Sequence, residues 1–200
     1  TQSRPVLILA SKSAARARVL EGAGLTFARQ PAGIDEATIK NALKDQGADA
    51  EQIATALAEA KAVAVSVNTP RALVIGADQI LECGRLFNKP ATSEEAARQL
   101  RSLSGRTHRL VSALCIARDG VIAWRHTAEA RLTMRRLSDG FITDYLSRTG
   151  PAALDAGGSY HLEGLGVNLF SCIDGDYFTI LGLPVLPLLT FLRGEDAIDG

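Results

Sequence analysis

The chain has 200 residues, and its 46% hydrophobic content is normal for a globular protein and sufficient for a sizeable core. Its 22 lysine and arginine residues equal its 22 aspartate and glutamate residues, so the formal net charge is zero. This balance argues against bulk attraction to a nucleic acid polymer or to an anionic membrane, because both favour a basic surplus. Phosphate binding would have to come from a few basic residues that the fold brings together.

The cysteines and the apolar segments indicate where the protein works. Cys83, Cys115 and Cys172 are widely spaced and include no CxxC pair, so we expect reduced thiols and three small buried side chains. The first residues show no basic segment followed by an apolar one, and we expect no signal peptide. The longest apolar stretch, residues 178–192, is too short for a bilayer and contains two prolines. These features predict a cytoplasmic protein.

The first third of the chain predicts strands and helices in alternation. Residues 6–10 are continuously apolar, as in a strand that is buried on both faces. Ser13 is a candidate N-cap for a helix over residues 14–21, which a glycine ends. The next expected elements are a short strand around Phe27, a polar loop over residues 31–46 and an alanine-rich helix over residues 50–67.

The middle of the chain adds hairpins. Residues 72–75 predict a second buried strand that runs directly into Gly76, Asp78 and Gln79. We expect a hairpin over residues 80–88, a helix from Thr92 to about Gly105, and a clear hairpin whose strands, residues 108–117 and 121–132, meet at Asp119-Gly120.

The last third predicts a helix over residues 138–147, a glycine-rich loop over 157–166, a strand near 168–172 and a final helix from about 184 to 192. Because helices and strands alternate but hairpins interrupt them, a mixed sheet with helices on its faces fits better than a regular parallel sheet. We therefore expect an α/β fold in a single domain over residues 1–200.

The first candidate site lies in the turn between the first predicted strand and the first predicted helix. Ser11, Ser13, free backbone N–H groups and the positive end of the helix dipole meet there, which suits an anion. Arg16, one turn into the helix, can offer a forked donor to phosphate. The alternative is a plain capped helix with an exposed arginine.

The second candidate site is Asp78, which follows a buried strand within an apolar run. Open α/β sheets place their ligands at such strand ends. A buried carboxylate costs several kcal/mol unless it is paired, hydrogen-bonded or bound to a metal. A purely structural aspartate is the alternative.

Asp35, Glu36, Lys61 and Lys89 add charges that would each, taken singly, be ordinary surface groups. Taken together they match phosphoryl chemistry, which needs carboxylates for a hard cation, cations for phosphate oxygens and a base for water. No GxxxxGK[ST] loop, GxGxxG, HExxH or GxSxG motif is present, and the three histidines follow no metal-ligand spacing.

At this point the residues resemble a known family, the Maf nucleotide pyrophosphatases. The motifs occur in the family's order over nearly the whole chain. They are LASKSAAR at 9–16, GIDE at 33–36, AKA at 60–62, IGADQ at 75–79, NKP at 88–90, LSGRTH at 103–108, GGSY at 157–160, EG at 163–164 and LGLP at 181–184. Each motif alone is weak, whereas the ordered set is specific.

The resemblance implies an elongated α/β fold around a mixed sheet, with two lobes around a central cleft, and often a homodimer. It implies hydrolysis of nucleoside triphosphates between the α- and β-phosphates with Mg²⁺ or Mn²⁺. By position, the catalytic residues are Asp78, which activates water, and Glu36, and both acids are metal-associated. The residues that resemble the family's phosphate-binding set, with Ser13 added from the strand-to-helix turn, are Ser11, Ser13, Arg16, Lys61 and Lys89.

The resemblance also divides the family by base, between 7-methyl-GTP and the pyrimidine nucleotides dTTP and UTP. Gln79 and Glu163 resemble the 7-methyl-GTP group, and a carboxylate at Glu163 could accept hydrogen bonds from the N1–H and N2–H₂ edge of guanine. Ala15 stands where that group carries a tryptophan, and residues 104–108 resemble the pyrimidine group. We lean to 7-methyl-GTP, with dTTP/UTP hydrolysis as the alternative.

An alternative from another functional class is that the protein binds nucleotides without hydrolysing them and regulates septum formation. The set formed by Glu36, Lys61, Asp78 and Lys89 favours catalysis, because a protein that only binds nucleotide does not need a carboxylate that activates water.

Overall fold

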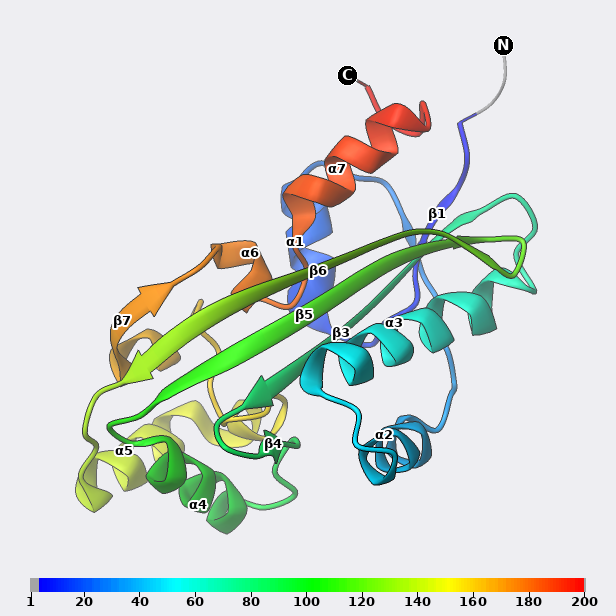
Figure 1. Ribbon diagram of the computed structural model, residues 1–200. Helices are drawn as coiled ribbons and strands as arrows, with labels where there is room; N and C mark the ends of the chain where they lie inside the picture. The colour runs from blue at the N-terminus through cyan, green and yellow to red at the C-terminus, as the bar shows by residue number, and fades with distance from the viewer. Residues whose placement is uncertain (1–3, 200) are drawn as a thin grey trace. The chain divides into compact units, whose positions relative to one another are not determined.

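The computed structural model describes residues 4–199 and has an α/β fold built on a mixed sheet (Figure 1). Seven strands occur within this range: β1 (Leu7–Leu9), β2 (Ala28–Arg29), β3 (Leu73–Glu82), β4 (Leu86–Phe87), β5 (Thr107–Arg118), β6 (Val121–Met134) and β7 (Phe170–Asp174). The helices are α1 (Ala14–Gly22), α2 (Glu36–Asp45), α3 (Ala50–Ser66), α4 (Ser93–Leu103), α5 (Asp139–Thr149), α6 (Tyr177–Ile180) and α7 (Val185–Gly194), with 3₁₀ turns η1 (Gly150–Leu154) and η2 (Leu165–Leu169).

The sheet has the strand order β2-β1-β3-β5-β6-β7, and β4 pairs with β3. Strand β1 is parallel to both β2 and β3, whereas β4 is antiparallel to β3 and β7 is antiparallel to β6. The β5–β6 turn has positive φ angles at both Asp119 and Gly120, 51° and 79°, which is the backbone that a two-residue hairpin requires. The predicted mixed sheet is confirmed.

The chain forms two compact units. The first comprises Thr1–Gln79, Ser112–Ala128 and Tyr177–Gly200, and the second comprises Ile80–Val111 and Glu129–Asp176. Within the part that the structure describes, no helix combines the length and the apolar character that a membrane crossing needs.

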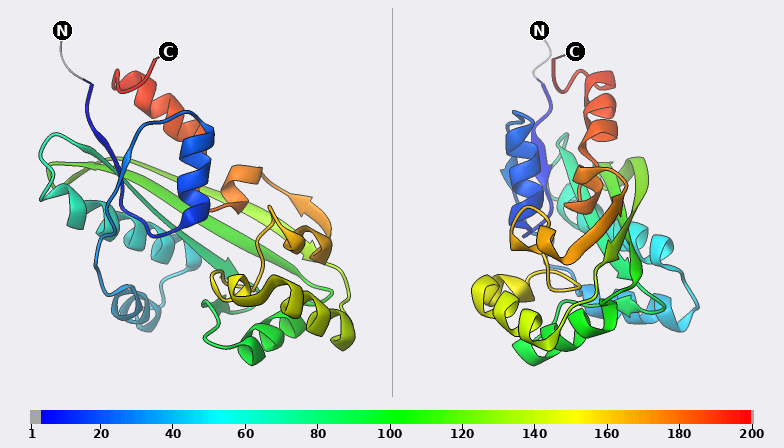
Figure 2. Two further views of the ribbon diagram at one scale, coloured as in Figure 1. Left: turned by 180° about the vertical axis from the view of Figure 1, so that it is seen from behind. Right: turned by 90° about the vertical axis from the view of Figure 1, so that its left-hand side faces the viewer.

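The first unit has helices on both faces of its strands (Figure 2). Leu73, Ile75 and Ala77 of β3 share one core with side chains of α1 and α7. Gly76 points the other way, because successive residues of a strand face opposite sides. A Cβ at Gly76 would lie only 2.1 Å from the Ala58 carbonyl oxygen of α3. The absence of a side chain at Gly76 therefore lets α3 approach β3 closely.

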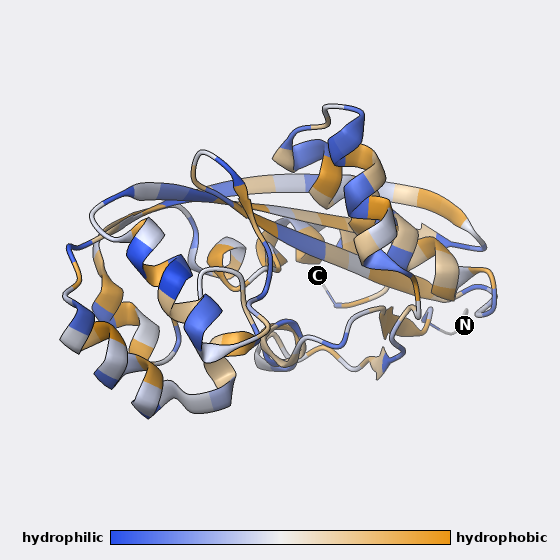
Figure 3. Ribbon diagram, turned by 90° about the horizontal axis from the view of Figure 1, so that it is seen from below, coloured by the Kyte–Doolittle hydropathy of each residue, from blue (hydrophilic) through white to orange (hydrophobic). Residues whose placement is uncertain are grey.

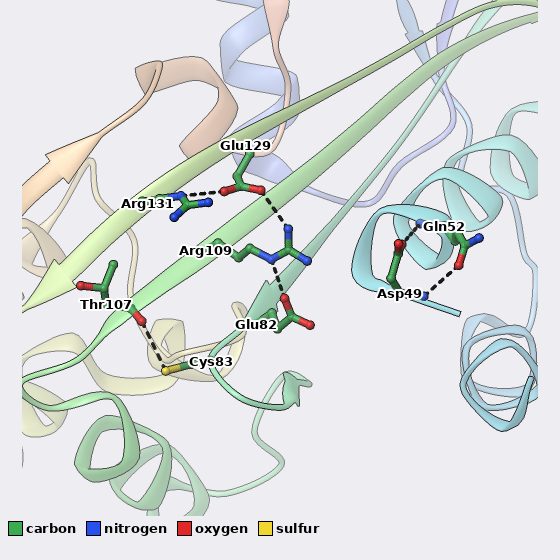
Figure 4. A network of polar contacts seen from close by, with 8 residues as sticks. All are labelled: Asp49, Gln52, Glu82, Cys83, Thr107, Arg109, Glu129 and Arg131. Atoms are coloured by element: carbon green, nitrogen blue, oxygen red, sulfur yellow. Dashed lines mark hydrogen bonds and ion pairs between the residues drawn. The ribbon is translucent and has the colours of Figure 1, made fainter. Parts of the chain in front are cut away.

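Helix α3 begins at a capping box in which Asp49 and Gln52 bond each other's backbone N–H groups, at 2.8 and 2.9 Å (Figure 4). Both distances are typical of good hydrogen bonds, so the start of the helix is well satisfied. The helices carry both hydrophobic and hydrophilic residues (Figure 3). In α4, the buried residues Ala96, Leu100 and Leu103 recur at the spacing of one helix face.

The second unit carries a ladder of charged side chains across β3, β5 and β6 (Figure 4). Arg109 donates to Glu82 at 2.5 Å and to Glu129 at 2.9 Å, and Arg131 donates to the other oxygen of Glu129 at 2.9 Å. In the same unit, buried Gln99 of α4 links two segments, because its amide donates to the Asn88 carbonyl and accepts from the Gly158 N–H, both at 2.8 Å. Gln99 therefore holds the glycine-rich loop beside the segment that ends in Lys89.

Three predictions about local structure are wrong. Residues 31–46 are not all loop, because the Asp35 side chain caps a helix, α2, by accepting from the Thr38 N–H at 3.0 Å. Strand β3 does not end at Ile75 but continues to Glu82, so Asp78 lies within a strand rather than after one. Cys172 is exposed rather than buried, because β7 is an edge strand with a mostly exposed face.

Candidate functional site

The turn from β1 to α1 is a compact set of hydroxyl contacts in the first unit. Ser13 is the N-cap of α1 and accepts from the Arg16 N–H at 3.3 Å. Ser11 is buried, and its hydroxyl oxygen accepts from the Ser13 N–H at 3.2 Å and from the Arg16 guanidinium at 3.3 Å. The predicted cap at Ser13 is confirmed, and the turn also fixes one edge of the Arg16 side chain. Ala15, on the same helix, is half-buried.

Lys61 lies between two carboxylates of the first unit. Its ammonium nitrogen is 2.7 Å from an Asp78 oxygen and 2.9 Å from a Glu36 oxygen. The side chains of Lys61 and Asp78 are only 7% and 10% exposed, whereas that of Glu36 is 54% exposed. One end of this bridge is therefore buried and the other end is open to solvent.

The packing of α3 on β3 produces the bridge. Asp78 lies two residues after Gly76 and so faces the same side of β3, toward α3. Lys61 stands between the small residues Ala58 and Ala62, both fully buried, which bring its helix against the strand. The long lysine side chain is then held against the sheet, where the Asp78 carboxylate compensates for the burial of its charge.

Two further cations are electrostatically coupled to the same carboxylates. Burial lowers the pKa of half-buried Arg16 from its ordinary value, while Asp78 and Glu36 act in the opposite direction. Burial is also the main cause that lowers the pKa of Lys40, followed by the nearby charge of Lys44, and Asp78 and Glu36 again oppose the change. Arginine stays charged at any physiological pH.

Lys40 is a candidate site residue that the sequence alone did not indicate. It lies four residues after Glu36 on α2, so the two share a face of the helix. That spacing becomes informative only once residues 36–45 are known to be helical. With Lys40 included, three cations interact with the carboxylates of Glu36 and Asp78: Lys61 by direct contact, and Arg16 and Lys40 electrostatically.

Gln79 faces the opposite side of β3 from Asp78. Its amide nitrogen is within hydrogen-bonding distance of the Ser112 hydroxyl and of the Thr179 and Ile180 carbonyls, at 2.9, 2.9 and 3.1 Å. The sequence offered no signal for these contacts, because α6 lies about a hundred residues further along the chain.

Lys89 and Glu163 belong to the second unit. Lys89 is exposed and follows the β4 strand, next to the Asn88 carbonyl that Gln99 holds. The Glu163 side chain is 24% exposed, and one of its oxygens lies 3.8 Å from the His161 ring. Participation of these two residues in one site with the residues of the first unit stays a prediction.

Comparison with known proteins gives the chain a family. The model of the family described as Maf-like protein matches residues 6–195. The chain is 51% identical over 195 residues, 97% of this chain and 98% of the relative, to a Brucella abortus protein named 7-methyl-GTP pyrophosphatase. It is 52% identical to a Rhizobium etli protein of the same name, over 98% of this chain and 99% of the relative.

A third relative, from Paramagnetospirillum magneticum, is named nucleoside triphosphate pyrophosphatase and is 49% identical over 93% of this chain and 96% of its own length. The family match and these relatives each cover more than nine-tenths of the chain, so no large part of it is left unassigned. The chain belongs to the Maf family.

Proposed function

We propose that this protein hydrolyses nucleoside triphosphates to nucleoside monophosphates and pyrophosphate, and that 7-methyl-GTP is its preferred nucleotide. The observation that carries the proposal is the Lys61 bridge, which joins Asp78 and Glu36. Both carboxylates are also electrostatically coupled to Arg16 and Lys40 of the same unit. The relatives named for this activity agree with it at about half identity over nearly the whole chain.

The residues present fit a divalent metal that is shared with the substrate. Within residues 4–199, no group of three or more His, Cys, Asp or Glu side chains is arranged to hold a metal ion. Glu36 and Asp78 nevertheless place two carboxylates around one ammonium. Mg²⁺ is usually held by one or two carboxylates together with substrate phosphates and water. Glu36 and Asp78 would hold the ion, which when bound neutralises the charge that develops on the phosphate oxygens.

Several residues of the chain bind the triphosphate. The triphosphate lies over the Ser11–Ser13 turn, at the positive end of α1, where an anion is favoured. Arg16, Lys40 and Lys61 contact its oxygens, and a phosphate contact by Lys89 stays the prediction that the resemblance makes. Since Lys61 is already paired with both carboxylates, its contribution includes keeping Glu36 and Asp78 close together.

Asp78 accepts the proton of the attacking water. Its burial at the side of α3 keeps bulk water away, and its contact with Lys61 holds the carboxylate in one orientation. The bond between the α- and β-phosphates breaks, the water oxygen ends on the nucleoside monophosphate, and pyrophosphate leaves between the cations. General base catalysis of this kind contributes about 10²- to 10⁴-fold to rates.

Base selection is assigned to Glu163. A carboxylate can accept both donors on the N1–H and N2–H₂ edge of guanine, and leaving that edge unpaired in a protein site costs specificity. The positive charge of a 7-methylated guanine adds an electrostatic preference for an acidic partner. The Glu163 side chain is partly exposed.

A panel of nucleotides tests the proposal. Pyrophosphate release is measured from 7-methyl-GTP, GTP, dTTP, UTP and ATP, each with and without Mg²⁺. We expect release with Mg²⁺ only, and fastest from 7-methyl-GTP. Faster turnover of dTTP or UTP would move the protein to the pyrimidine group, and tight nucleotide binding without any release would indicate a regulator.

A further inference from the structure

The amide of Gln79 has a fixed orientation. Thr179 and Ile180 present carbonyl oxygens, which can only accept, so the nitrogen of the amide and not its oxygen must face them. The Ser112 hydroxyl donates to the Thr179 carbonyl at 2.8 Å and is therefore an acceptor for Gln79. A glutamine in this place acts as a donor to the end of α6.

Several donors converge on the carbonyls at the end of α6. The last carbonyls of a helix have no partner within the helix, and α6 is only four residues long. The Gly182 N–H also donates to the Thr179 carbonyl, at 3.0 Å, which closes the turn after α6. Gly182 has a φ of 85°, a conformation that glycine adopts readily. Gln79 thus ties the turn at Gly182 to strand β3.

The same turn holds Arg16. The Gly182 carbonyl accepts from the Arg16 Nε–H at 2.9 Å, and the other side of the guanidinium donates to Ser11. A Cβ at Gly182 would lie 3.4 Å from Arg16 Nε and 3.7 Å from the Gln79 side-chain carbon Cδ. The Arg16 guanidinium and the Gln79 amide therefore both lie beside Gly182, and the position of the Gly182 carbonyl sets the direction of the guanidinium.

We propose that Gln79 is a positioning residue for Arg16, acting through the α6–Gly182 turn, and that it contributes to triphosphate binding whatever the base. The inference rests on the proposed function, in which Arg16 contacts the triphosphate. It differs from a role in reading the base, for which Gln79 would use its remaining acceptor oxygen.

A ligand without a base separates the two roles. Binding of inorganic tripolyphosphate with Mg²⁺ is measured by calorimetry for the wild type and for Gln79→Ala and Gln79→Glu. Glutamate keeps the size and an acceptor oxygen but cannot donate to the α6 carbonyls. We expect both variants to bind tripolyphosphate roughly tenfold more weakly, since small misplacements of a phosphate-binding group are costly. The exposed Gln46, changed to Ala, is the matched control and keeps wild-type affinity.

A double-mutant cycle with Arg16→Ala tests whether Gln79 acts through Arg16. If Gln79 acts through Arg16, then Gln79→Ala has little further effect on tripolyphosphate binding once Arg16 is removed. Equal losses in both backgrounds would overturn the proposal, as would wild-type affinity in both Gln79 variants.

A crystal structure of Gln79→Ala decides the inference without reference to turnover. We expect the Gly182 turn to shift and the Arg16–Gly182 hydrogen bond to be lost. An unchanged Arg16–Gly182 contact would overturn the positioning role even for an active enzyme. Failure of the wild type to release pyrophosphate from any nucleotide would instead refute the proposed function, and the two failures are thus distinguishable.

Discussion

The two units bury polar side chains in opposite ways. In the first unit, Lys61 and Asp78 are buried as an ion pair with a mostly exposed carboxylate, Glu36, at one end. In the second unit, His108 and Tyr160 are 2% and 5% exposed and share a hydrogen bond of 2.7 Å. Burial lowers the pKa of His108 to about 4 and raises that of Tyr160, so both stay neutral.

The difference separates a candidate site from a core. In the neutral cluster, formed by His108, Tyr160 and Phe170, His108 Nε2 and the Tyr160 hydroxyl share a hydrogen bond and both rings pack against Phe170. Among the described residues, His108 Nδ1 is buried without a hydrogen-bond partner, which adds to the cost of charging this ring.

The charged cluster, formed by Arg16, Glu36, Lys40, Lys61 and Asp78, instead keeps cations coupled to carboxylates next to the exposed side chain of Glu36. Removing these charges from water costs free energy, but the arrangement offers a place for a charged ligand. If this contrast is right, changes in the charged cluster affect turnover and changes in the neutral cluster affect stability alone.

The largest effect is expected from breaking the charged pair. Lys61→Met leaves the Asp78 carboxylate buried without its nearest cation. We expect the free energy of unfolding to fall by about 3–5 kcal/mol, as for other buried pairs that lose one partner. Urea denaturation measures the loss.

The double variant Lys61→Met with Asp78→Asn is the matched control. It removes the stranded charge, so we expect it to recover part of the lost stability while staying inactive. A single variant as stable as the wild type would show that Lys61 and Asp78 are not a buried pair in solution.

The second effect concerns pH and the neutral cluster. The ordinary histidine pKa of 6.5 falls to about 4 at His108 in the folded state, so between these values the unfolded chain binds more protons. The contribution of His108 to the free energy of unfolding is therefore retained above pH 6.5. It falls by about 3 kcal/mol as the pH decreases toward 4. His108→Gln, which does not titrate, should lose less stability over the same range.

Denaturation curves at several pH values between 7 and 4 measure the difference between wild type and His108→Gln. Parallel pH profiles for the two proteins would contradict a neutral buried His108. The rate of pyrophosphate release by His108→Gln at pH 7 should equal that of the wild type.

The smallest effect comes from the cap of α2. Asp35→Ala removes the acceptor for the Thr38 N–H and hydroxyl, so the first turn that carries Glu36 should fray. We expect turnover to fall severalfold. Ser138→Ala removes the matching cap of α5 in the second unit and should leave turnover unchanged. Equal turnover in the two variants would show that the start of α2 does not contribute to the charged cluster.

Local signals in the sequence predict much of this fold. The apolar run before Ala10, the cap at Ser13 and the Asp119-Gly120 turn each act over a few residues, and each has the expected structure. Asp35 was interpreted as an acid in a loop, because a capping aspartate and a solvated one look alike without knowledge of the helix that follows.

The site was only partly predictable for a related reason. The roles of Glu36 and Asp78 came from resemblance, and the bridge between them needs the close approach of α3 to β3 at Gly76. Lys40 depends on the helix that was missed. The anchoring of the α6 end by Gln79 joins residues so far apart in the chain that no spacing rule could pair them.

Asp78→Asn tests the central claim most directly, namely that this buried carboxylate activates water on a bound triphosphate. Asparagine keeps the shape and can still contact Lys61, so the protein should fold and bind tripolyphosphate. The account predicts that the rate of pyrophosphate release from 7-methyl-GTP falls by about 10²- to 10⁴-fold. Release at the wild-type rate by the folded Asp78→Asn protein would contradict it.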